Sequence, residues 1–314
     1  MKILVTGAAG FIGSHLVDEF LEKNWEVVGV DDLSNGNFEY LKRTEHIVGD
    51  FAADCVLDRV SSGEFDVVCH QAALPRVAYS VAEPIKTNDA NLTKTLSLLD
   101  ACRSTKPRFL FASSSSVYGD VRAEDLPLAE LQRKMPKSPY ALQKSTVEDY
   151  CRLYSELYGL QTICLRYFNV FGPRQKGNSP YATVVAAWLD ALMADRPLRF
   201  DGDGEQGRDH CHIDNVKKAN SLAVVENDLP DRHSVFNIAC GEMVTNNEIL
   251  RRIMSLAGAR GIKVVGAPGR PGDIKFTKAD ISRAHAWLRY DPVVRFWDAF
   301  DKMCKVALGN TGDR

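Results

Sequence analysis

The sequence predicts an α/β fold in which a doubly wound parallel sheet is followed by a smaller, mixed α/β C-terminal lobe. Over residues 1–172, short apolar runs alternate with segments of helical period, a pattern typical of parallel sheets. A glycine-rich turn separates the first apolar run from the first helical segment. After residue 172, prolines and glycines cluster and the alternation stops. We therefore expect a first domain over residues 1–172 and a ligand-covering lobe over residues 173–314, with some later segments returning to the sheet.

The first domain should begin with a strand at residues 2–5, where an apolar run ends in glycines. A helix should follow, because apolar residues at positions 11, 12, 16, 17, 20 and 21 repeat with the helical period. The other strands expected in this domain are apolar runs at 26–32, 46–50, 65–73, 108–116 and 161–172. Further helices are expected at 88–104 and 138–159, and the second half should add a strand at 234–240 and a helix at 245–258.

The composition argues against several classes of protein. With 314 residues, 45 % hydrophobic and 25 % charged, the chain has an ordinary globular composition and enough length for a large core. A formal net charge of −2 and scattered basic residues argue against nucleic acid or an anionic membrane as a partner. No apolar run approaches the ~18–20 residues of a membrane span, and the start of the sequence lacks the layout of a signal peptide. We expect a cytoplasmic protein without a metal site, because its eight cysteines show no zinc-like spacing.

The glycine turn predicts a dinucleotide site. Gly7, Gly10 and Gly13 lie between the first strand and the first helix, where small residues let the backbone approach a pyrophosphate and the helix start offers free N–H groups. Asp31, at the end of the second strand, should accept hydrogen bonds from the adenosine ribose and repel a 2′-phosphate. The cofactor should therefore be NAD rather than NADP. Asp50, at the end of the third strand, could lie beside the adenine or could cap its own loop.

Six segments carry a family resemblance: "TGAAGFIGSHL", "HQAAL", "FASSSSVYGD", "SPYALQK", "LRYFNVFGPRQ" and "GDGEQGRDHCHIDN". In them the chain resembles the extended short-chain dehydrogenase/reductase family, in its branch of NAD-dependent sugar epimerases and dehydratases. Within that branch it is most similar to the 4-epimerases of UDP-N-acetylglucosamine (UDP-GlcNAc) and UDP-N-acetylgalactosamine (UDP-GalNAc). The resemblance implies a Rossmann sheet, bound NAD, a UDP-sugar substrate and a homodimer. The dimer would pack the helical segments 95–102 and 147–159 into a four-helix bundle.

The resemblance, together with the glycine turn, assigns a set of residues to the cofactor. These residues are Gly7, Gly10, Phe11, Ile12, Gly13, Asp31, Asp32, Asp50, Phe51, Ala72, Asn91, Tyr140, Lys144 and Tyr167.

The resemblance also implies the catalytic residues. Tyr140 would exchange a proton with a sugar hydroxyl, and Lys144, four residues later on the same helix face, would lie beside it and reach the cofactor ribose. We expect Lys144 and the nicotinamide ring to lower the pKa of the phenol from ~10 toward neutrality. Ser114 would share the sugar oxygen with Tyr140. Ser113 should point to the opposite face of its strand.

The resemblance places further residues at the substrate. Asn169, Arg208 and Arg270 would hold the diphosphate, where the fork of donors on arginine suits phosphate oxygens. Asp273 would contact the nucleoside ribose. The residues expected around the sugar are Ser80, Ser114, Ser115 and Thr277.

The reaction is inferred by comparison with the family's other enzymes. Dehydratases carry Asp-Glu where this chain has Ser115 and Ser116, so elimination would lack its proton carriers, and a serine at 116 also counts against a decarboxylase. That leaves epimerisation at C4. Thr277 stands where a tyrosine restricts related enzymes to glucose and galactose, so we expect UDP-GlcNAc and UDP-GalNAc as substrates.

Three alternatives stay open. The first two are a 4-epimerase of UDP-glucose and UDP-galactose and one of UDP-uronic acids, because residues 75–79 depart from the pattern of the acetyl-sugar enzymes and Tyr79 replaces an arginine. The third is a non-catalytic NAD-binding regulator.

Overall fold

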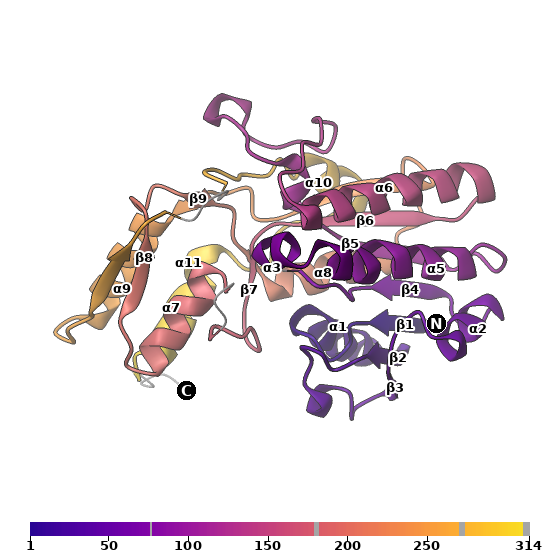
Figure 1. Cartoon of the computed structure of the whole chain (residues 1–314), viewed down its shortest axis with the longest axis horizontal. Helices are drawn as coiled ribbons and strands as arrows, with labels where there is room; N and C mark the ends of the chain where they lie inside the picture. Colours follow the sequence, from indigo (N-terminus) through magenta and orange to yellow (C-terminus); the bar gives the residue numbers. More distant parts are fainter. Residues whose placement is uncertain (76, 179–181, 270–273, 310–314) are drawn as a thin grey trace.

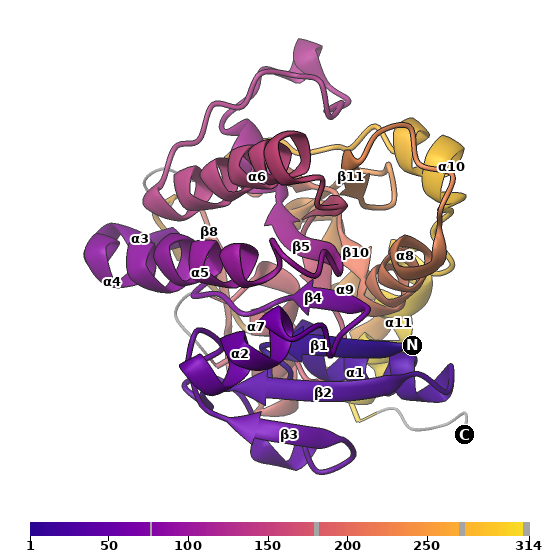
Figure 2. The ribbon, with the colours of Figure 1, turned by 90° about the vertical axis from the view of Figure 1, so that its right-hand side faces the viewer.

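The computed structural model describes residues 1–75, 77–178, 182–269 and 274–309. Its largest unit is a seven-stranded sheet in which every paired neighbour is parallel, with the order β11-β6-β5-β4-β1-β2-β3. The strands are β1 Lys2–Thr6, β2 Glu26–Asp31, β3 Glu45–Val48, β4 Val67–His70, β5 Arg108–Ser114, β6 Thr162–Tyr167 and β11 His233–Ile238. Figure 2 shows β5, β4, β1, β2 and β3 one above another in this order. Each overlaps a strand expected from the sequence, so the predicted doubly wound sheet is confirmed.

Helices cover both faces of the sheet. One face packs α1 Phe11–Glu22, α8 Ile213–Val225 and α10 Ser282–Leu288 against alternate apolar residues of the strands. The other face packs α2 Asp54–Ser61, α5 Lys94–Ala101 and α6 Pro139–Tyr158. The alternation is visible in β1, where Ile3 and Val5 face the first group and Leu4 faces the second. Burial on both faces explains why these strands are continuous apolar runs in the sequence.

The strand order reverses between β1 and β4, since β1 leads outward to β2 while β4 leads outward to β5. In open parallel sheets, ligands bind beside the carboxyl ends of the strands at such a reversal. The glycine turn follows β1, and Ser114 ends β5. The fold therefore gathers the predicted site residues of the first domain at one edge.

A second lobe lies beside the sheet (Figure 1). It consists of α7 Val184–Met193, α9 Asn246–Ala257, α11 Phe296–Ala307 and the parallel strands β8 Leu198–Asp201 and β13 Val264–Ala267. Its core is a separate cluster that includes Trp188, Ile249 and Phe300. Two pairs of very short strands connect segments that are distant in the sequence. β7 Val170–Phe171 pairs with β10 Cys211–His212, and β9 Gly207–Arg208 pairs with β12 Val244–Thr245.

The remaining elements are short. They are α3 Val77–Ala82, α4 Pro84–Asn88, a π-helical turn η2 Asp89–Thr93, and the 3₁₀ turns η1 Phe38–Tyr40, η3 Ser115–Tyr118 and η4 Ala123–Asp125. The helix expected at 88–104 is thus split, because its first part is the π turn that leads into α5.

The described residues contain neither a membrane-spanning helix nor a metal-binding cluster. None of the helices in the described part of the chain is both long and apolar enough to cross a membrane. Across the same residues, no three His, Cys, Asp or Glu side chains gather as they would around a metal ion.

Candidate active site

The glycine turn brings the start of α1 into direct contact with the end of β1. Gly7 has a φ of +67°, and a Cβ atom there would lie 2.8 Å from the backbone nitrogen of Ala72. A Cβ atom on Gly13 would overlap the carbonyl oxygen of Gly7. The helix is capped by Gly10 without any side-chain hydrogen bond, so no side chain caps its first amide groups. A narrow backbone cradle with uncapped amides fits a pyrophosphate.

Asp31 closes the other side of this cradle. Its carboxylate is buried and accepts hydrogen bonds from the backbone N–H groups of Ala9 (2.9 Å) and Leu33 (2.8 Å). Burial raises the pKa of Asp31, although these amide donors act in the opposite direction. Asp32 is exposed and accepts from the N–H of Ser34 at 2.9 Å. Asp31 therefore shapes the glycine turn, and its carboxylate beside the uncapped amides fits a dinucleotide. Its contact with the ribose of NAD stays a prediction.

Asp50 caps its own loop. One carboxylate oxygen accepts from the N–H of Ala52 at 2.9 Å, and the other lies 2.6 Å from Nζ of Lys94. The adjacent Phe51 is buried, with its ring centre 4.8 Å from that of His70. The structure thus shows the capping role that the sequence left as one of two alternatives, and contact with adenine stays a prediction for both residues.

Two other residues assigned to the cofactor have protein partners for their polar atoms. Asn91 is buried, exchanges two hydrogen bonds with the backbone of Leu74 (2.7 and 3.2 Å) and donates to Oε1 of Gln143 at 2.8 Å. It therefore fixes the loop after β4 against α6. The buried hydroxyl of Tyr167 accepts from Nδ2 of Asn220 at 2.8 Å. Neither side chain has a polar atom that is plainly free for a ligand.

The helix that carries Tyr140 and Lys144 begins where the sequence predicts. Ser138 caps α6 by accepting from the N–H of Ala141 at 3.1 Å, and a proline occupies the first helical position. Tyr140 and Lys144 lie on its buried face. Nζ of Lys144 donates to the carbonyl oxygen of Ala112 at 2.7 Å and lies 5.9 Å from the centre of the Tyr140 ring. The structure therefore brings the expected pair together at the end of β5.

The pKa of Tyr140 differs from the expectation. Burial raises it to about 12, opposed by a hydrogen bond with Ser114. Burial also lowers the pKa of Lys144 to about 7, opposed by the negative charge of Glu148. The protein's own groups thus disfavour the phenolate, because the ring is desolvated and the Lys144 amine is bonded to the carbonyl of Ala112.

The serine run places its hydroxyls on opposite sides of β5. Oγ of Ser114 accepts from the N–H (3.2 Å) and the hydroxyl (3.0 Å) of Ser116, so its own proton can be donated elsewhere. Ser113 donates to Glu148 at 2.6 Å, on the face away from Ser114, as expected from strand geometry. Ser115 is buried in the 3₁₀ turn that follows.

Ser80 contacts the catalytic helix. Its buried hydroxyl donates to the carbonyl of Val77 at 2.6 Å and accepts from the N–H of Tyr140 at 3.1 Å. The hydroxyl therefore positions Tyr140, and its predicted contact with the sugar stays a prediction.

The residues predicted at the substrate diphosphate come from the second half of the chain. Arg208 donates from Nη1 to the carbonyls of Gly207 (3.1 Å) and Lys275 (2.9 Å). Thr277 is buried, and its hydroxyl accepts from the N–H of Asp209 at 3.3 Å, so Arg208 and Thr277 lie on paired backbone segments. Asn169 is half-buried just before β7. Arg270 and Asp273 lie outside the described residues.

Asp209 is a structural residue that the sequence reasoning missed. Its fully buried carboxylate accepts from the N–H groups of Cys240 (2.9 Å), Gly241 (3.0 Å) and Ala279 (3.1 Å). Three distant segments therefore meet next to Arg208. The next residue, His210, is buried with an Nε2 that has no hydrogen-bond partner within the described ranges.

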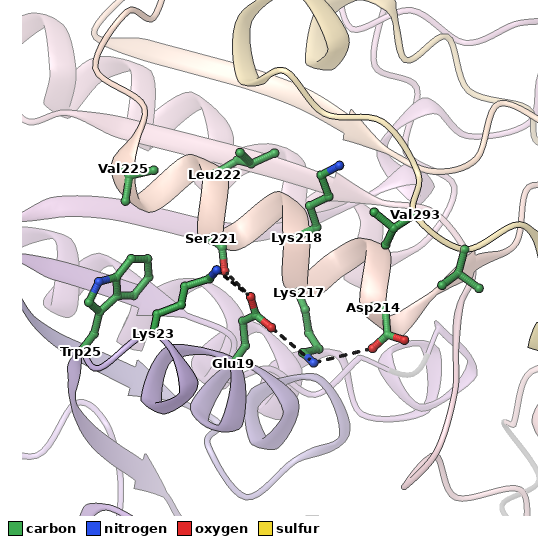
Figure 3. A pocket seen from close by; sticks show the side chains of 11 residues that line it. Glu19, Lys23, Trp25, Asp214, Lys217, Lys218, Ser221, Leu222, Val225 and Val293 are labelled. Atoms are coloured by element: carbon green, nitrogen blue, oxygen red, sulfur yellow. Dashed lines mark hydrogen bonds and ion pairs between the residues drawn. The ribbon is translucent and has the colours of Figure 1, made fainter. Parts of the chain in front are cut away.

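A hollow between α1 and α8 contains none of the predicted site residues (Figure 3). Glu19 lies at its centre, accepts from the hydroxyl of Ser221 at 3.0 Å and pairs with Lys23 and Lys217, each at 3.3 Å. These contacts tie the two helices together. The candidate active site is therefore the edge at the carboxyl ends of the strands.

Comparison with known proteins identifies the family of the chain. The sequence profile of the NAD dependent epimerase/dehydratase family matches residues 3–239. The structure of the UDP-N-acetylglucosamine 4-epimerase from Methanobrevibacter ruminantium, in complex with UDP-N-acetylmuramic acid, superposes with a TM-score of 0.87 at 36 % identity, over 98 % of this chain and 97 % of that one.

Two further solved structures are similar. The UDP-glucose 4-epimerase from Thermotoga maritima, with UDP-glucose, has a TM-score of 0.90 at 33 % identity, over 97 % of this chain and 98 % of that one. The UDP-glucuronic acid 4-epimerase from Bacillus cereus, with UDP-glucuronic acid and NAD, has a TM-score of 0.86 at 31 % identity, over 98 % and 99 %. The family profile matches most of the chain, and the glycine turn and the YxxxK helix meet at one edge of the sheet. The chain therefore belongs to the NAD-dependent epimerase/dehydratase family.

Proposed function

We propose that this protein is an NAD-dependent UDP-sugar 4-epimerase that interconverts UDP-GlcNAc and UDP-GalNAc. The observation that carries the proposal is the buried Tyr140, beside Lys144 and Ser114, at the sheet edge where the glycine turn forms a pyrophosphate cradle. The similar structures described above are 4-epimerases of three different UDP-sugars, which supports the reaction class.

In this proposal the two parts of the chain have different ligands. Residues 1–172 bind NAD, and residues 173–314 mainly bind the nucleotide sugar, although α8 and α10 pack on the sheet and β11 is its edge strand. The glycine turn and Asp31 hold NAD together with Lys144. When bound, NAD would supply a reversible hydride acceptor for sugar C4, and its positive ring would stabilise a phenolate nearby.

The protein's part is to move one proton and to hold the sugar. Tyr140 as phenolate removes the proton of the 4-hydroxyl while C4 becomes a ketone. It returns this proton after the keto sugar has rotated in the pocket and presents its other face. Ser114, whose oxygen already accepts two hydrogen bonds, donates its proton toward the same sugar oxygen. Reduction then occurs on the other face of the ketone, so the sugar is inverted at C4 with no net change in oxidation state.

Substrate residues follow the same assignment. Asn169 and Arg208, with Arg270 from outside the described residues, bind the diphosphate, and Asp273, also outside them, binds the ribose. Ser80, Ser115 and Thr277 border the sugar. The hydroxyl of Thr277 is held by the backbone of Asp209, and its side chain is smaller than the tyrosine expected in enzymes restricted to glucose and galactose. This supports substrates with an N-acetyl group.

UDP-glucose is a second candidate substrate. The loop before Ser80 carries Tyr79, a half-buried ring where we expect an arginine in acetyl-sugar enzymes, and such a ring would narrow the sugar pocket. A similar structure is a UDP-glucose 4-epimerase with UDP-glucose.

Product analysis separates these candidates. The purified protein is incubated with UDP-GlcNAc, UDP-glucose or UDP-glucuronic acid, without added oxidant or reductant, and the epimers are separated by chromatography. We expect UDP-GalNAc to form with the highest kcat/KM of the three reactions. A higher kcat/KM for an unacetylated sugar would refute the sugar choice, and the absence of any epimer would refute the reaction.

A variant tests the role of Thr277. Thr277→Tyr should lower kcat/KM for UDP-GlcNAc by about 10–200-fold, since a pocket discriminates bulk by about 1–3 kcal/mol, and should spare UDP-glucose. Thr277→Val, which keeps the size, serves as the matched control. Equal losses for both sugars in a folded Thr277→Tyr protein would contradict the assignment.

A further inference from the structure

A third buried polar residue lies on the same face of α6 as Tyr140 and Lys144. Glu148 follows at the same spacing of four on α6, and the three residues are 8 %, 3 % and 2 % exposed. Residues four apart on a helix share a face, so Glu148 lies directly behind Lys144 as seen from Tyr140. A buried carboxylate is costly unless it is paired, which makes its partners informative.

The partners of Glu148 lie on the two strands next to the site. One carboxylate oxygen accepts from the hydroxyl of Ser113 (2.6 Å) and from Nε of Arg166 (2.8 Å), and the other accepts from Nη2 of Arg166 (2.7 Å). Lys134 adds an ion pair at 3.5 Å. Glu148 therefore ties α6 to both β5 and β6, which lie beside it in Figure 1.

The contact with Ser113 falls between two residues of the site. Ala112, one position earlier, accepts the hydrogen bond of Lys144, and Ser114, one position later, is the predicted partner of Tyr140. Holding Ser113 thus fixes the carbonyl that orients Lys144 and the hydroxyl that faces the phenol. Displacing Glu148 would move both relative to α6.

Glu148 also contributes charge at Lys144. The groups that act on this amine are Tyr140 and Glu148 from α6, Cys164 and Arg166 from β6, His70 from β4, and the Ala112 carbonyl from β5. Glu148 favours the ammonium form of Lys144, which burial opposes. It is also the counter-ion of Arg166, whose Nη2 lies 2.7 Å from a Glu148 oxygen. Burial raises the pKa of Glu148 itself, but the bonds from Arg166 and Ser113 outweigh it and hold that pKa below its usual value, so the carboxylate is charged at neutral pH.

We propose that Glu148 is a positioning residue of this active site: it supplies the negative charge that stabilises the Lys144 ammonium, and through Ser113 and Arg166 it fixes the catalytic helix against β5 and β6. The proposal rests on the proposed function, because a role for the ammonium presumes the reaction at Tyr140. The charge on Lys144 can nevertheless be measured without turnover.

The sign of the expected effect follows from the charges. Glu148→Gln keeps the shape but removes the negative charge and leaves the Arg166 cation buried without a carboxylate. Both changes favour neutral Lys144, so its pKa should fall by about one unit or more. Lys134→Met removes a cation from the other side of Glu148 and should not lower the pKa of Lys144. A purely structural role would give no such difference between the two variants.

The titration is followed by NMR on protein labelled with ¹³C,¹⁵N-lysine, with the Lys144 signal assigned from its loss in Lys144→Arg. We expect a midpoint near pH 7 in the unsubstituted protein, a lower midpoint in Glu148→Gln and no lowering in Lys134→Met. An unchanged midpoint in folded Glu148→Gln would overturn the proposal. If that variant does not fold, Glu148→Asp replaces it: the retained charge should keep the midpoint, and a midpoint lowered by one unit would count against the proposal.

Kinetics supply the second measurement. In the pH profile of kcat/KM, Glu148→Gln should move the alkaline limb to lower pH, since Lys144 loses its charge earlier, whereas Lys134→Met should not. If kcat/KM of Glu148→Gln is lower at every pH by the same factor, with the acidic and alkaline limbs of the profile at unchanged pH, a role through Lys144 is contradicted. If the unsubstituted protein epimerises no UDP-sugar, the proposed function fails, while the NMR midpoints still decide whether Glu148 controls the charge on Lys144.

Discussion

The side chain of Tyr140 is held in a position where the protein alone does not favour its ionisation. Burial raises its pKa to about 12, and the nearest ammonium donates to a backbone carbonyl instead of the phenol. A hydroxyl with this environment becomes an effective base only when further positive charge lies beside it. The pKa of Tyr140 should therefore depend on whether NAD is bound.

Tyr140→Phe tests the assigned acid/base. Removing the hydroxyl should lower kcat by about 10²–10⁴-fold, the usual contribution of a general acid/base, while bound NAD, measured by absorbance after release, should be retained. Tyr158→Phe, on the last turn of the same helix, is the matched control and should keep full activity. Activity of the Tyr140 variant within a few-fold of the unsubstituted protein would show that another group moves the proton.

His210 gives a prediction about acid stability. Burial lowers its pKa to about 3, whereas an unfolded histidine has a pKa near ~6.5, so between these values only the unfolded state binds the proton. Stability is therefore lost as the pH falls, at up to about 1.4 kcal/mol per pH unit. His210→Phe removes this loss, so from pH 7 to pH 5 its free energy of unfolding should gain about 2 kcal/mol relative to the unsubstituted protein.

Urea unfolding at several pH values measures this difference. At pH 7 the variant should be at least as stable as the unsubstituted protein, because the phenyl ring replaces a buried nitrogen that has no partner in the described residues. A constant difference between pH 7 and pH 5 would contradict the assigned pKa.

At the scale of elements, Asp209 joins parts of the chain that no local pattern connects. It follows β9, and its three amide donors come from the turn after β11 and from the segment before α10. Arg208 lies next to it, so the orientation of a predicted phosphate ligand depends on this junction. Burial raises the pKa of Asp209 to about 7, and the three N–H donors oppose this by stabilising the carboxylate. Each of these hydrogen bonds contributes about 0.5–3 kcal/mol to stability.

Asp209→Asn should therefore destabilise the protein by about 3 kcal/mol, since one amide oxygen cannot replace two carboxylate oxygens and the NH₂ group would face an N–H donor. Asp203→Asn, an exposed aspartate that accepts a single N–H, is the control and should cost less than about 1 kcal/mol. Chemical denaturation measures both. Equal stabilities of the two variants would show that the junction contributes little.

The sheet could be predicted from the sequence, but the second lobe could not be predicted in detail. Strands such as β1 and β6 are buried on both faces and leave continuous apolar runs, whereas the two-residue strands β7, β9, β10 and β12 are too short to leave a pattern. The pair of Tyr140 and Lys144 was visible because its spacing lies on one helix. The hydrogen bonds of Ser80 and Asp209 could not be predicted, because their partners lie far away in the sequence and are brought near only by the tertiary fold.

At the scale of the molecule, α6 carries an apolar stripe on the side away from the sheet. Leu142, Leu153 and Leu157 are 57 %, 37 % and 67 % exposed and share one face of the helix. Val81 and Ile85, on α3 and α4 next to α6, extend it with exposures of 63 % and 86 %. The sequence predicted a homodimer through the helix that carries these leucines, and an exposed apolar patch of this kind suits a partner surface.

The homodimer remains a prediction, and the double variant Leu153→Glu with Leu157→Glu tests it. Two charges in a buried interface should convert a dimer into a monomer, measured as a halved mass in light scattering after size-exclusion chromatography. Leu131→Glu, at a residue that is 91 % exposed outside α6, should leave the mass unchanged. A monomeric unsubstituted protein, or a dimer that survives both glutamates, would contradict this interface.

The position of β11 has a consequence for biosynthesis. This strand pairs along the whole length of β6, yet a ribosome makes it only after the intervening segments of the second lobe. During that delay the nascent β6 presents an apolar strand with one unpaired hydrogen-bonding edge. The early part of the chain is therefore vulnerable to aggregation while it is being translated, and chaperone dependence should be greatest before residues 233–238 leave the exit tunnel.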